Sequence, residues 1–345
     1  MNDFNPNDIG VANGNYFGLP YSVNDSEIVL ISVPWDVTTS YCAGTSNGPQ
    51  AIIDASVQVD LFDQVVPQAW EVKIGTVPVD KNVIKHNKVA RKIAEEVIET
   101  LACGEKYRSV EKQTAQVNEA SVQINGYVNG LSEEYLKNGK FVGVVGGEHS
   151  VPLGLIKALG EKYDDFGILH IDAHADLRNA YEGFTYSHAS IMFNVLKEVP
   201  AVSRITQVAV RDFCSDEYAI MREQGGRVCS FTDTDLCRDK FEGHSWMEIC
   251  DKIIATLPRN VYVSFDIDGL SPELCPNTGT PVPGGLSYRE ADYLLERLVK
   301  SDRKMIGFDL CEVAPSLDGE REWDANVGAR VLFKLSLYAK KSLNK

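Results

Sequence analysis

The residues with the clearest chemical potential in this sequence come directly after an apolar run. Residues 167–177 read GILHIDAHADL, which places Asp172, His174 and Asp176 at alternate positions where the chain heads for the protein interior. Burying unpaired carboxylates is costly, and a histidine between two aspartates has few structural uses. We therefore expect a positively charged partner at this point of the chain.

Three further segments carry charged or imidazole side chains after apolar runs. In GGEHS, His149 follows a double glycine, and the segment FDID contains Asp266 and Asp268. Residues two apart point to the same side of a strand, so we expect these two carboxylates to face one site. The segment CEVAP contains Glu312 after another apolar run.

The apolar runs themselves predict the elements that position these residues. Continuous apolar runs are typical of parallel strands that are buried on both faces. The expected strands are residues 28–33, 142–145, 168–171, 205–210, 261–267 and 305–310. Helical apolar spacing occurs at residues 89–101, 151–159, 288–299 and 327–339. This alternation predicts an α/β fold with three α/β/α layers around a central, mostly parallel sheet.

Ligands of open parallel sheets bind beyond the carboxyl ends of the strands. Three of the expected strand ends bring together six metal-binding side chains, His149, Asp172, His174, Asp176, Asp266 and Asp268. Six ligands exceed the needs of one tetrahedral ion, and they suit a pair of divalent ions that share carboxylates and activate water near neutral pH. Because no thiolate takes part, a hard ion such as Mn²⁺ is favoured, although raw affinity is higher for Zn²⁺ or Ni²⁺.

The length of 345 residues is compatible with one large domain carrying insertions or with two domains. No linker divides the chain. We expect residues 1–25 to form an N-terminal arm and residues 26–345 a single catalytic domain. A polar stretch at about residues 104–139, with a helix at 110–136, is expected to be a surface excursion.

The charge balance limits the classes of partner. The chain has 34 Lys and Arg against 49 Asp and Glu, a net charge of −15, which repels nucleic acid and anionic membranes. It begins without a basic segment followed by an apolar one, and its apolar runs stay well below the roughly 18 residues of a membrane span. We expect a soluble, cytoplasmic protein with no nucleic-acid or membrane partner.

The segments GGEHS, DAHAD and SFDIDGLSP, in this order, resemble the signatures of the ureohydrolases, the family of arginase and agmatinase. The resemblance extends from VPWDVTTSYCAGTSNGPQAI near residue 33 to EVAP near residue 312. It implies an arginase-like fold, two Mn²⁺ ions per chain held by the six side chains named above, and a homo-oligomer, either a trimer or a hexamer.

The resemblance also implies catalytic roles. The glutamate before Val and Pro, here Glu312, anchors the guanidinium of a small guanidine-type substrate. The histidine of YSHAS, His188, is the proton shuttle, since imidazole titrates near pH 7. We assign to Asp176 the transfer of a proton from the nucleophilic water to the departing amine, so that the products are urea and an amine.

The substrate is less closely specified. The segment NTGTPVPGGL resembles the agmatinase branch, which converts agmatine to putrescine and urea. Arg178 would instead pair well with a carboxylate tail, and formimidoylglutamase carries a similar DLR run. Formimidoylglutamase, a guanidino-acid hydrolase and arginase therefore remain alternatives, as does an Arg178 that points to solvent or pairs with a local glutamate such as Glu182.

Two hypotheses from other classes of protein remain open. Metal-dependent deacetylases share the fold but resemble a one-zinc site, and a metal-free relative could act as a scaffold. Three further histidines lie outside the ligand set. We expect His170 to support the site or belong to the core, and His86 and His244 to lie at the surface or at helix ends.

Overall fold

The computed structural model of the chain describes residues 4–223, 226–316 and 322–345. Within these residues, eight strands form one sheet in the order β2-β1-β3-β8-β7-β4-β5-β6, with every neighbouring pair parallel. The strands are β1 (Ile28–Val33), β2 (Ile74–Val77), β3 (Phe141–Gly146), β4 (Phe166–Ile171), β5 (Val202–Val208), β6 (Val228–Phe231), β7 (Asn260–Asp266) and β8 (Lys304–Cys311).

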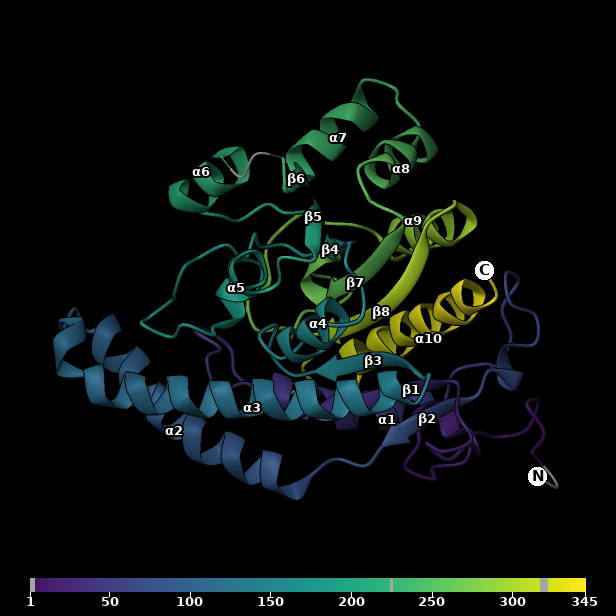
Figure 1. Cartoon of the computed structure of the whole chain (residues 1–345), viewed down its shortest axis with the longest axis horizontal. Coiled ribbons are helices and arrows are strands. Elements are labelled where there is room, and N and C mark those ends of the chain that lie inside the picture. The colour runs from purple at the N-terminus through teal and green to yellow at the C-terminus, as the bar shows by residue number, and fades with distance from the viewer. Residues whose placement is uncertain (1–3, 224–225, 317–321) are drawn as a thin grey trace.

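Helices cover both faces of the sheet (Figure 1). They are α1 (Gly48–Ser56), α2 (Lys81–Ala102), α3 (Glu111–Lys137), α4 (Leu153–Gly160), α5 (Ile191–Glu198), α6 (Ser215–Glu223), α7 (Asp233–Phe241), α8 (Trp246–Ala255), α9 (Tyr288–Lys300) and α10 (Trp323–Leu343). One apolar core includes side chains of α1, α8, α9 and α10, and a second includes those of α2, α3, α4 and α5. The predicted three-layer architecture is confirmed. None of these helices is long and apolar enough to cross a bilayer.

Strand β1 shows why its sequence is apolar throughout. Val29, Ile31 and Val33 belong to the core on one face of the sheet, whereas Ile28 and Leu30 belong to the core on the other. Successive side chains of a strand point to opposite faces, so a strand between two helical layers needs apolar residues at every position. All six residues of β1 are buried.

The expected strands all exist, with shifted ends, but the two outermost strands were not predicted. Strands β2 and β6 have four residues each and lie at the two edges of the sheet. Three of the four residues of β6 are only partly buried. All four residues of β2 are buried, but its sequence, IGTV, contains a glycine and a threonine. Neither edge strand therefore has the continuous apolar run that identifies the inner strands.

The four strands that precede the candidate site residues lie next to one another, in the order β3-β8-β7-β4. His149 comes shortly after β3, Asp172 directly after β4, and Glu312 directly after β8, while Asp266 is the last residue of β7. Because all four strands are parallel, their carboxyl ends meet at one edge of the sheet. The topology therefore gathers the candidate residues at one place.

The polar stretch around residues 104–139 contains the whole of α3, which lies beside α2 (Figure 1). One side of α3 is buried, with Val117 and Val128 fully enclosed, and the other side is exposed. The connected ends of α2 and α3 project beyond the sheet.

The segment before β1 is partly built into the fold. Tyr16 and Phe17 are buried, and the Tyr16 hydroxyl lies 2.7 Å from the Ser32 hydroxyl. The Phe17 amide donates a hydrogen bond to Ser56 Oγ at 2.7 Å. This part of the expected N-terminal arm thus packs against the domain, and residues 1–3 of that arm lie outside the described residues.

Candidate metal centre

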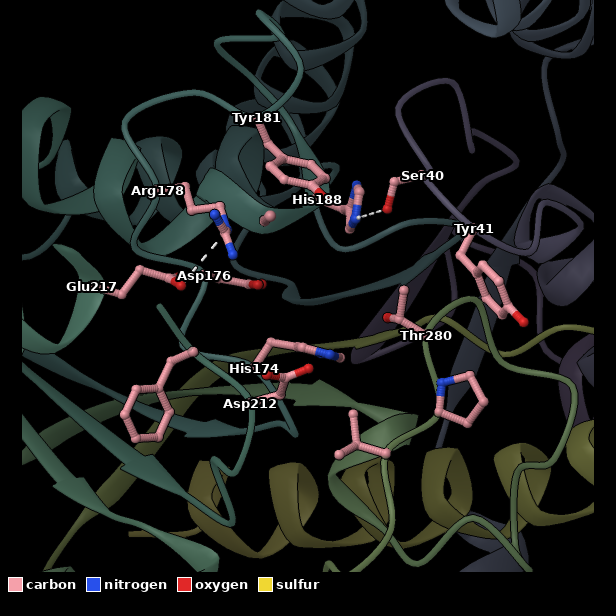
Figure 2. Close-up of a pocket in the computed structure, with 14 residues that line it drawn as sticks. Ser40, Tyr41, His174, Asp176, Arg178, Tyr181, His188, Asp212, Glu217 and Thr280 are labelled. Carbon is pink, nitrogen blue, oxygen red and sulfur yellow. Dashed lines mark hydrogen bonds and ion pairs between the residues drawn. The ribbon is translucent and has the colours of Figure 1, made fainter. Parts of the chain in front are cut away.

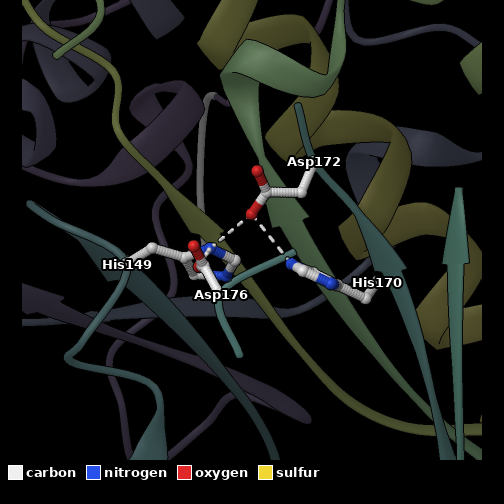
Figure 3. A group of neighbouring side chains, drawn as sticks. All are labelled: His149, His170, Asp172 and Asp176. Atoms are coloured by element: carbon white, nitrogen blue, oxygen red, sulfur yellow. Dashed lines mark hydrogen bonds and ion pairs between the residues drawn. The ribbon is translucent and has the colours of Figure 1, made fainter. Parts of the chain in front are cut away.

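Four buried side chains form the first group of the site: His149, His170, Asp172 and Asp176 (Figure 3). His149 Nδ1 lies 2.9 Å from Asp172 Oδ2 and 3.2 Å from Asp176 Oδ2. The same nitrogen lies 3.3 Å from Asp266 Oδ2. One ligand atom from each member of the group falls within 4.8 Å of the others, so the group has the dimensions of a site for one metal ion.

A second group consists of Asp172, His174 and Asp268, again with ligand atoms within 4.8 Å. His174 Nδ1 lies 3.0 Å from Asp268 Oδ2 and 3.5 Å from Asp172 Oδ1. Asp172 therefore turns Oδ2 toward the first group and Oδ1 toward the second. A carboxylate common to two neighbouring groups is what a site for two ions with a bridging ligand requires.

The paired aspartates of FDID reach the site in a different way from the one expected. Strand β7 ends at Asp266, and Asp268 lies in the short 3-10 turn Ile267–Gly269. The prediction that both lie on one face of a strand is wrong. The Asp268 amide donates to Asp266 Oδ1 at 2.9 Å, and this local bond ends the strand. Asp268 Oδ1 also accepts from the Ala173 amide at 3.0 Å, which ties the turn to the DAHAD segment.

His170 is fully buried, and both of its ring nitrogens are engaged. Gln207 Nε2 lies 3.1 Å from His170 Nδ1, and Ser230 Oγ donates to Gln207 Oε1 at 2.8 Å, which orients the amide. With Nδ1 as acceptor, Nε2 carries the proton and donates to Asp172 Oδ2 at 2.8 Å. This arrangement suits a residue that orients the Asp172 carboxylate, because it leaves no ring lone pair for an ion.

The electrostatics of the cluster reflect its many carboxylates. Burial raises the pKa of Asp266 well above its usual value, and the charges of Asp268 and Asp172 raise it further. Burial and the charge of Asp172 raise the pKa of Asp176 to about 6. For His149, burial favours a lower pKa, but hydrogen bonds with the aspartates outweigh it and raise the pKa well above the usual value. The side chains of the site alone therefore supply too little positive charge to neutralise the carboxylates of the cluster.

The donor set fits divalent metal ions. Four carboxylates and two imidazoles converge, and within the described residues Asp268 Oδ2 accepts no well-oriented hydrogen bond. The contact of this oxygen with His174 Nδ1 at 3.0 Å is poorly oriented for a hydrogen bond, so a cation between the two groups would stabilise the buried carboxylate. Oxygen and imidazole ligands without thiolate suit harder divalent ions.

Glu312 is a buried carboxylate, and one of its two oxygens has no hydrogen-bond donor among the described residues. Its Oε1 accepts from the His149 amide at 2.9 Å, while Oε2 accepts no hydrogen bond from the described residues. Burial and the charge of Glu148 raise the pKa of Glu312 well above its usual value. The backbone of Glu312 has a φ of 63° and that of Asp176 a φ of 53°, a region that non-glycine residues rarely adopt. Such strain persists where the surroundings hold the residue in place.

A cavity of about 260 Å³ leads to the cluster (Figure 2). His174 and Asp176 line it, which connects it to both groups, and Arg178, His188 and Asp212 form part of its walls. Asp212 Oδ atoms accept no hydrogen bond from another described residue. A small molecule entering this cavity would meet the candidate ligands at its inner end.

The Arg178 side chain is held against the wall of the cavity. Its Nε lies 3.6 Å from Glu217 Oε2, and its guanidinium lies 4.8 Å from the centre of the Tyr181 ring. The partner is therefore a glutamate, as one alternative proposed, but it is Glu217 and not Glu182. Glu217 comes from α6, a helix that sequence patterns did not predict.

His188 forms another part of the cavity wall. Its Nδ1 lies 3.3 Å from the Thr38 hydroxyl and its Nε2 lies 3.5 Å from the Ser40 hydroxyl. Burial lowers the pKa of His188, and a positive charge on His174 lowers it further. The imidazole is therefore neutral at pH 7 in the metal-free chain. A neutral ring can still accept a proton.

Sequence reasoning missed several residues that hold the site together. Arg211 Nη2 donates to the carbonyl oxygens of Asp268 at 2.7 Å and Leu270 at 3.1 Å. Arg211 directly follows the expected strand at residues 205–210. Because functional residues of parallel sheets lie beyond the carboxyl ends of the strands, its position could have identified it. Gln207, which orients His170, is a polar residue within that same apolar run, and a buried polar residue needs a partner.

A parallel α/β sheet with an acidic, imidazole-containing cluster beyond its strand ends defines a three-layer α/β protein with a candidate site for divalent metal ions. Sequence comparison assigns the chain to one family of such proteins. The family described as "Arginase family" matches residues 26–337, so the chain belongs to the arginase family. The family depends on two metal ions, which agrees with the two groups of ligand atoms.

Curated relatives agree with this assignment, and a solved structure shares the fold. The chain is 31% identical over 298 residues to the N(1)-aminopropylagmatine ureohydrolase of Thermus thermophilus, covering 86% of this chain and 85% of that protein. It is 27% identical to the agmatinase of Bacillus subtilis, covering 91% and 92%. The fold superposes on a hypothetical agmatinase from Burkholderia thailandensis with a TM-score of 0.71 and 22% identity, over 99% of this chain and 94% of the other.

Proposed function

We propose that this chain hydrolyses agmatine to putrescine and urea. The observation that carries the proposal is the distribution of charge along the cavity. Glu312 accepts a hydrogen bond from the amide of His149, a member of the cluster, and its Oε2, which has no partner among the described residues, is available there to a guanidinium. The Asp212 carboxylate lies in the cavity wall. Arg178, the residue that would favour an acidic tail, is already paired with Glu217. The relatives named as agmatinases support the same substrate class.

We propose further that the two metal ions are Mn²⁺. The side chains that would hold them are those of His149, Asp172, His174, Asp176, Asp266 and Asp268. The ions, when bound, supply Lewis acidity that activates water at neutral pH and offsets negative charge in the transition state. The proposal is supported by the absence of a thiolate from the donor set.

The remaining steps are assigned to side chains of the cavity. Glu312 binds the guanidinium through a charge-assisted hydrogen bond and orients its carbon toward the cluster. Asp176, which lines the inner end of the cavity, accepts a proton from the attacking water and passes it to the departing amine. His188 lines the cavity together with Ser40, whose hydroxyl lies 3.5 Å from its Nε2, and it exchanges protons between the site and solvent.

A longer amine-tailed guanidine is a second candidate substrate. The Tyr41 side chain, which lines the cavity, is 77% exposed, so the outer end of the cavity opens to solvent there. A tail extended by an aminopropyl group would not meet a wall at that point. The relatives named as N(1)-aminopropylagmatine ureohydrolases support this possibility.

The proposal is tested by measuring urea release from agmatine, N(1)-aminopropylagmatine, arginine and 4-guanidinobutyrate after loading with Mn²⁺, with formimidoylglutamate followed by formamide release. We expect kcat/KM for an amine-tailed substrate to exceed that for the acid-tailed ones by about 10-fold or more, roughly the effect of one charge–charge mismatch. Preference for an acid-tailed substrate would overturn the proposal. Metal analysis of the loaded protein should give about two ions per chain.

A further inference from the structure

Helices α2 and α3, referred to below as the helical hairpin, contribute no residue to the metal-binding groups or to the cavity lining in the part of the chain that the structure describes. The hairpin nevertheless binds the two loops that hold His188. One loop is the turn Tyr181–Phe184, which precedes His188, and the other is the segment 36–41, which contacts the imidazole.

Helix α3 binds the first loop through Asn118. Its Nδ2 donates to the Gly183 carbonyl at 3.1 Å, and its Oδ1 accepts from the Thr185 amide at 2.9 Å. In the turn Tyr181–Phe184, φ is 53° at Glu182 and 83° at Gly183, the pattern of a type I′ turn. A glutamate in that region is strained, so a bond from outside the turn stabilises a conformation that the turn sequence favours only weakly.

Gly183 packs directly against the hairpin. A Cβ at this position would lie 2.9 Å from Thr114 Cγ2 of α3 and 2.3 Å from a ring carbon of Tyr107, which lies in the connection between α2 and α3. Both the positive φ and this contact require glycine. The turn therefore has one docked position on the hairpin.

Helix α2 binds the second loop. Asn87 Oδ1 accepts from the Asp36 amide at 2.8 Å, and Asn87 Nδ2 donates to Asp36 Oδ1 at 2.9 Å. Arg91 Nη1 donates to three carbonyl oxygens of the segment, at 3.3, 3.2 and 2.6 Å. The hydroxyls of Thr38 and Ser40, in the same segment, lie 3.3 Å and 3.5 Å from the ring nitrogens of His188.

We infer that Asn118 and Arg91 are positioning residues for His188, and that the helical hairpin clamps both loops of the cavity wall. The inference rests on the proposed function, in which His188 exchanges protons with solvent. Neither residue touches the metal-binding side chains or the cavity. Losing either one should therefore impair proton transfer more than the binding of substrate or metal.

The first test replaces Asn118 with alanine. Asn129→Ala is the matched control, because Asn129 lies on the same helix and its Nδ2 donates to the Gly154 carbonyl at 3.2 Å, away from the cavity loops. We expect kcat with agmatine to fall about 10-fold in Asn118→Ala, since small displacements of a catalytic group are costly. KM and bound metal should stay within about 2-fold, and added imidazole should restore part of kcat. Equal kcat values in the two variants would overturn the inference.

Arg91→Met tests the other helix in the same assay. Arg227→Met is its control, because the Arg227 guanidinium also donates to backbone carbonyls, those of Leu196 and Val202, but at the far end of α5. We expect Arg91→Met to lower kcat with the same partial rescue by imidazole, and Arg227→Met to leave kcat unchanged.

Hydrogen exchange of the metal-free protein gives a readout that does not depend on activity. The His188 amide donates to Thr38 Oγ1 at 3.1 Å across the two loops, so its protection reports their docking. We expect this amide to exchange about 10-fold faster in Asn118→Ala and at the wild-type rate in Asn129→Ala. Unchanged exchange at His188 would overturn the clamp. If the wild-type chain released no urea from any guanidine, the proposed function would fail, and the exchange experiment would still decide whether the hairpin holds the loops.

Discussion

Arg178 Nε lies 3.6 Å from Oε2 of Glu217, a carboxylate that is almost fully buried. The same Glu217 accepts hydrogen bonds from the amides of Leu177 and Cys214 at 3.1 and 2.9 Å. These amides hold the carboxylate in place, and the carboxylate in turn offsets the charge of Arg178. The cavity thus contains an arginine without presenting an unpaired positive charge to a substrate tail.

Replacing Glu217 with glutamine should change substrate preference. The freed charge of Arg178 would repel the ammonium of agmatine, so we expect kcat/KM for agmatine to fall about 10-fold and that for 4-guanidinobutyrate to rise. Arg178→Met should leave agmatine hydrolysis within about 3-fold of wild type, because that charge is already offset. Parallel kinetics with both substrates would check this, and an unchanged ratio in Glu217→Gln would show that Arg178 has no influence on the tail.

Neutralising one carboxylate of the cluster should have opposite effects on the metal-free and metal-loaded protein. In Asp266→Asn we expect the metal-free melting temperature to stay the same or rise, because like charges are removed from a buried site. The rise in melting temperature on adding Mn²⁺ should shrink, since wild-type protein at 100 times Kd gains about 2.7 kcal/mol. Thermal melts with and without Mn²⁺ measure both quantities. Asp302→Asn, at an exposed aspartate, should behave as wild type. A full Mn²⁺ shift in Asp266→Asn would contradict its role as a ligand.

Glu148 should make the metal-free protein less stable at higher pH. Burial raises the pKa of Glu148 from 4.5 to about 7, although hydrogen bonds from Ser150 and Thr38 partly oppose the rise. Between these pH values the folded chain holds the proton that the unfolded chain has released, so the free energy of unfolding falls as pH increases, by about 3 kcal/mol in total.

Urea denaturation between pH 5 and 7.5, with a chelator present, measures this dependence. Glu148→Gln should reduce it and leave the part due to other buried carboxyls such as Asp176, while Glu119→Gln, at an exposed position on α3, should keep it in full. Identical pH dependence in wild type and Glu148→Gln would be inconsistent with a glutamate that is protonated in the folded chain.

His188→Ala should lose proton transfer without losing metal. We expect kcat with agmatine to fall about 10²-fold, the usual contribution of a general acid or base, and free imidazole to restore part of it. His244→Ala, which changes an exposed histidine, is the control. Steady-state kinetics with and without imidazole provide the measurement. Full activity in His188→Ala would remove this residue from the mechanism.

The inner strands and the gathering of candidate ligands could be predicted because they depend on local patterns. Buried parallel strands need apolar residues on both faces, as β1 shows, and parallel strands place their carboxyl ends together. His149, Asp172 and Asp266 could therefore be assigned to one edge before the strand order was known.

Other features depend on contacts between distant segments and could not be predicted. The pairing of Arg178 with Glu217 requires the position of α6, and the tautomer of His170 requires Gln207 on the neighbouring strand β5. The lowered pKa of His188 likewise arises from its enclosure by segments far away in sequence. A local pattern contains no information about such partners.

The position of β8 in the sheet has a consequence for the synthesis of the chain. Strand β8 lies between β3 and β7, so it joins one half of the sheet, β2-β1-β3, to the other, β7-β4-β5-β6. A nascent chain that ends before residue 304 contains all six candidate ligands but leaves the inner edges of both halves unpaired, and such edges invite wrong pairing. The site is therefore completed only after β8 has been synthesised. A chain truncated shortly before β8 would be prone to aggregation and would not be a partly active enzyme.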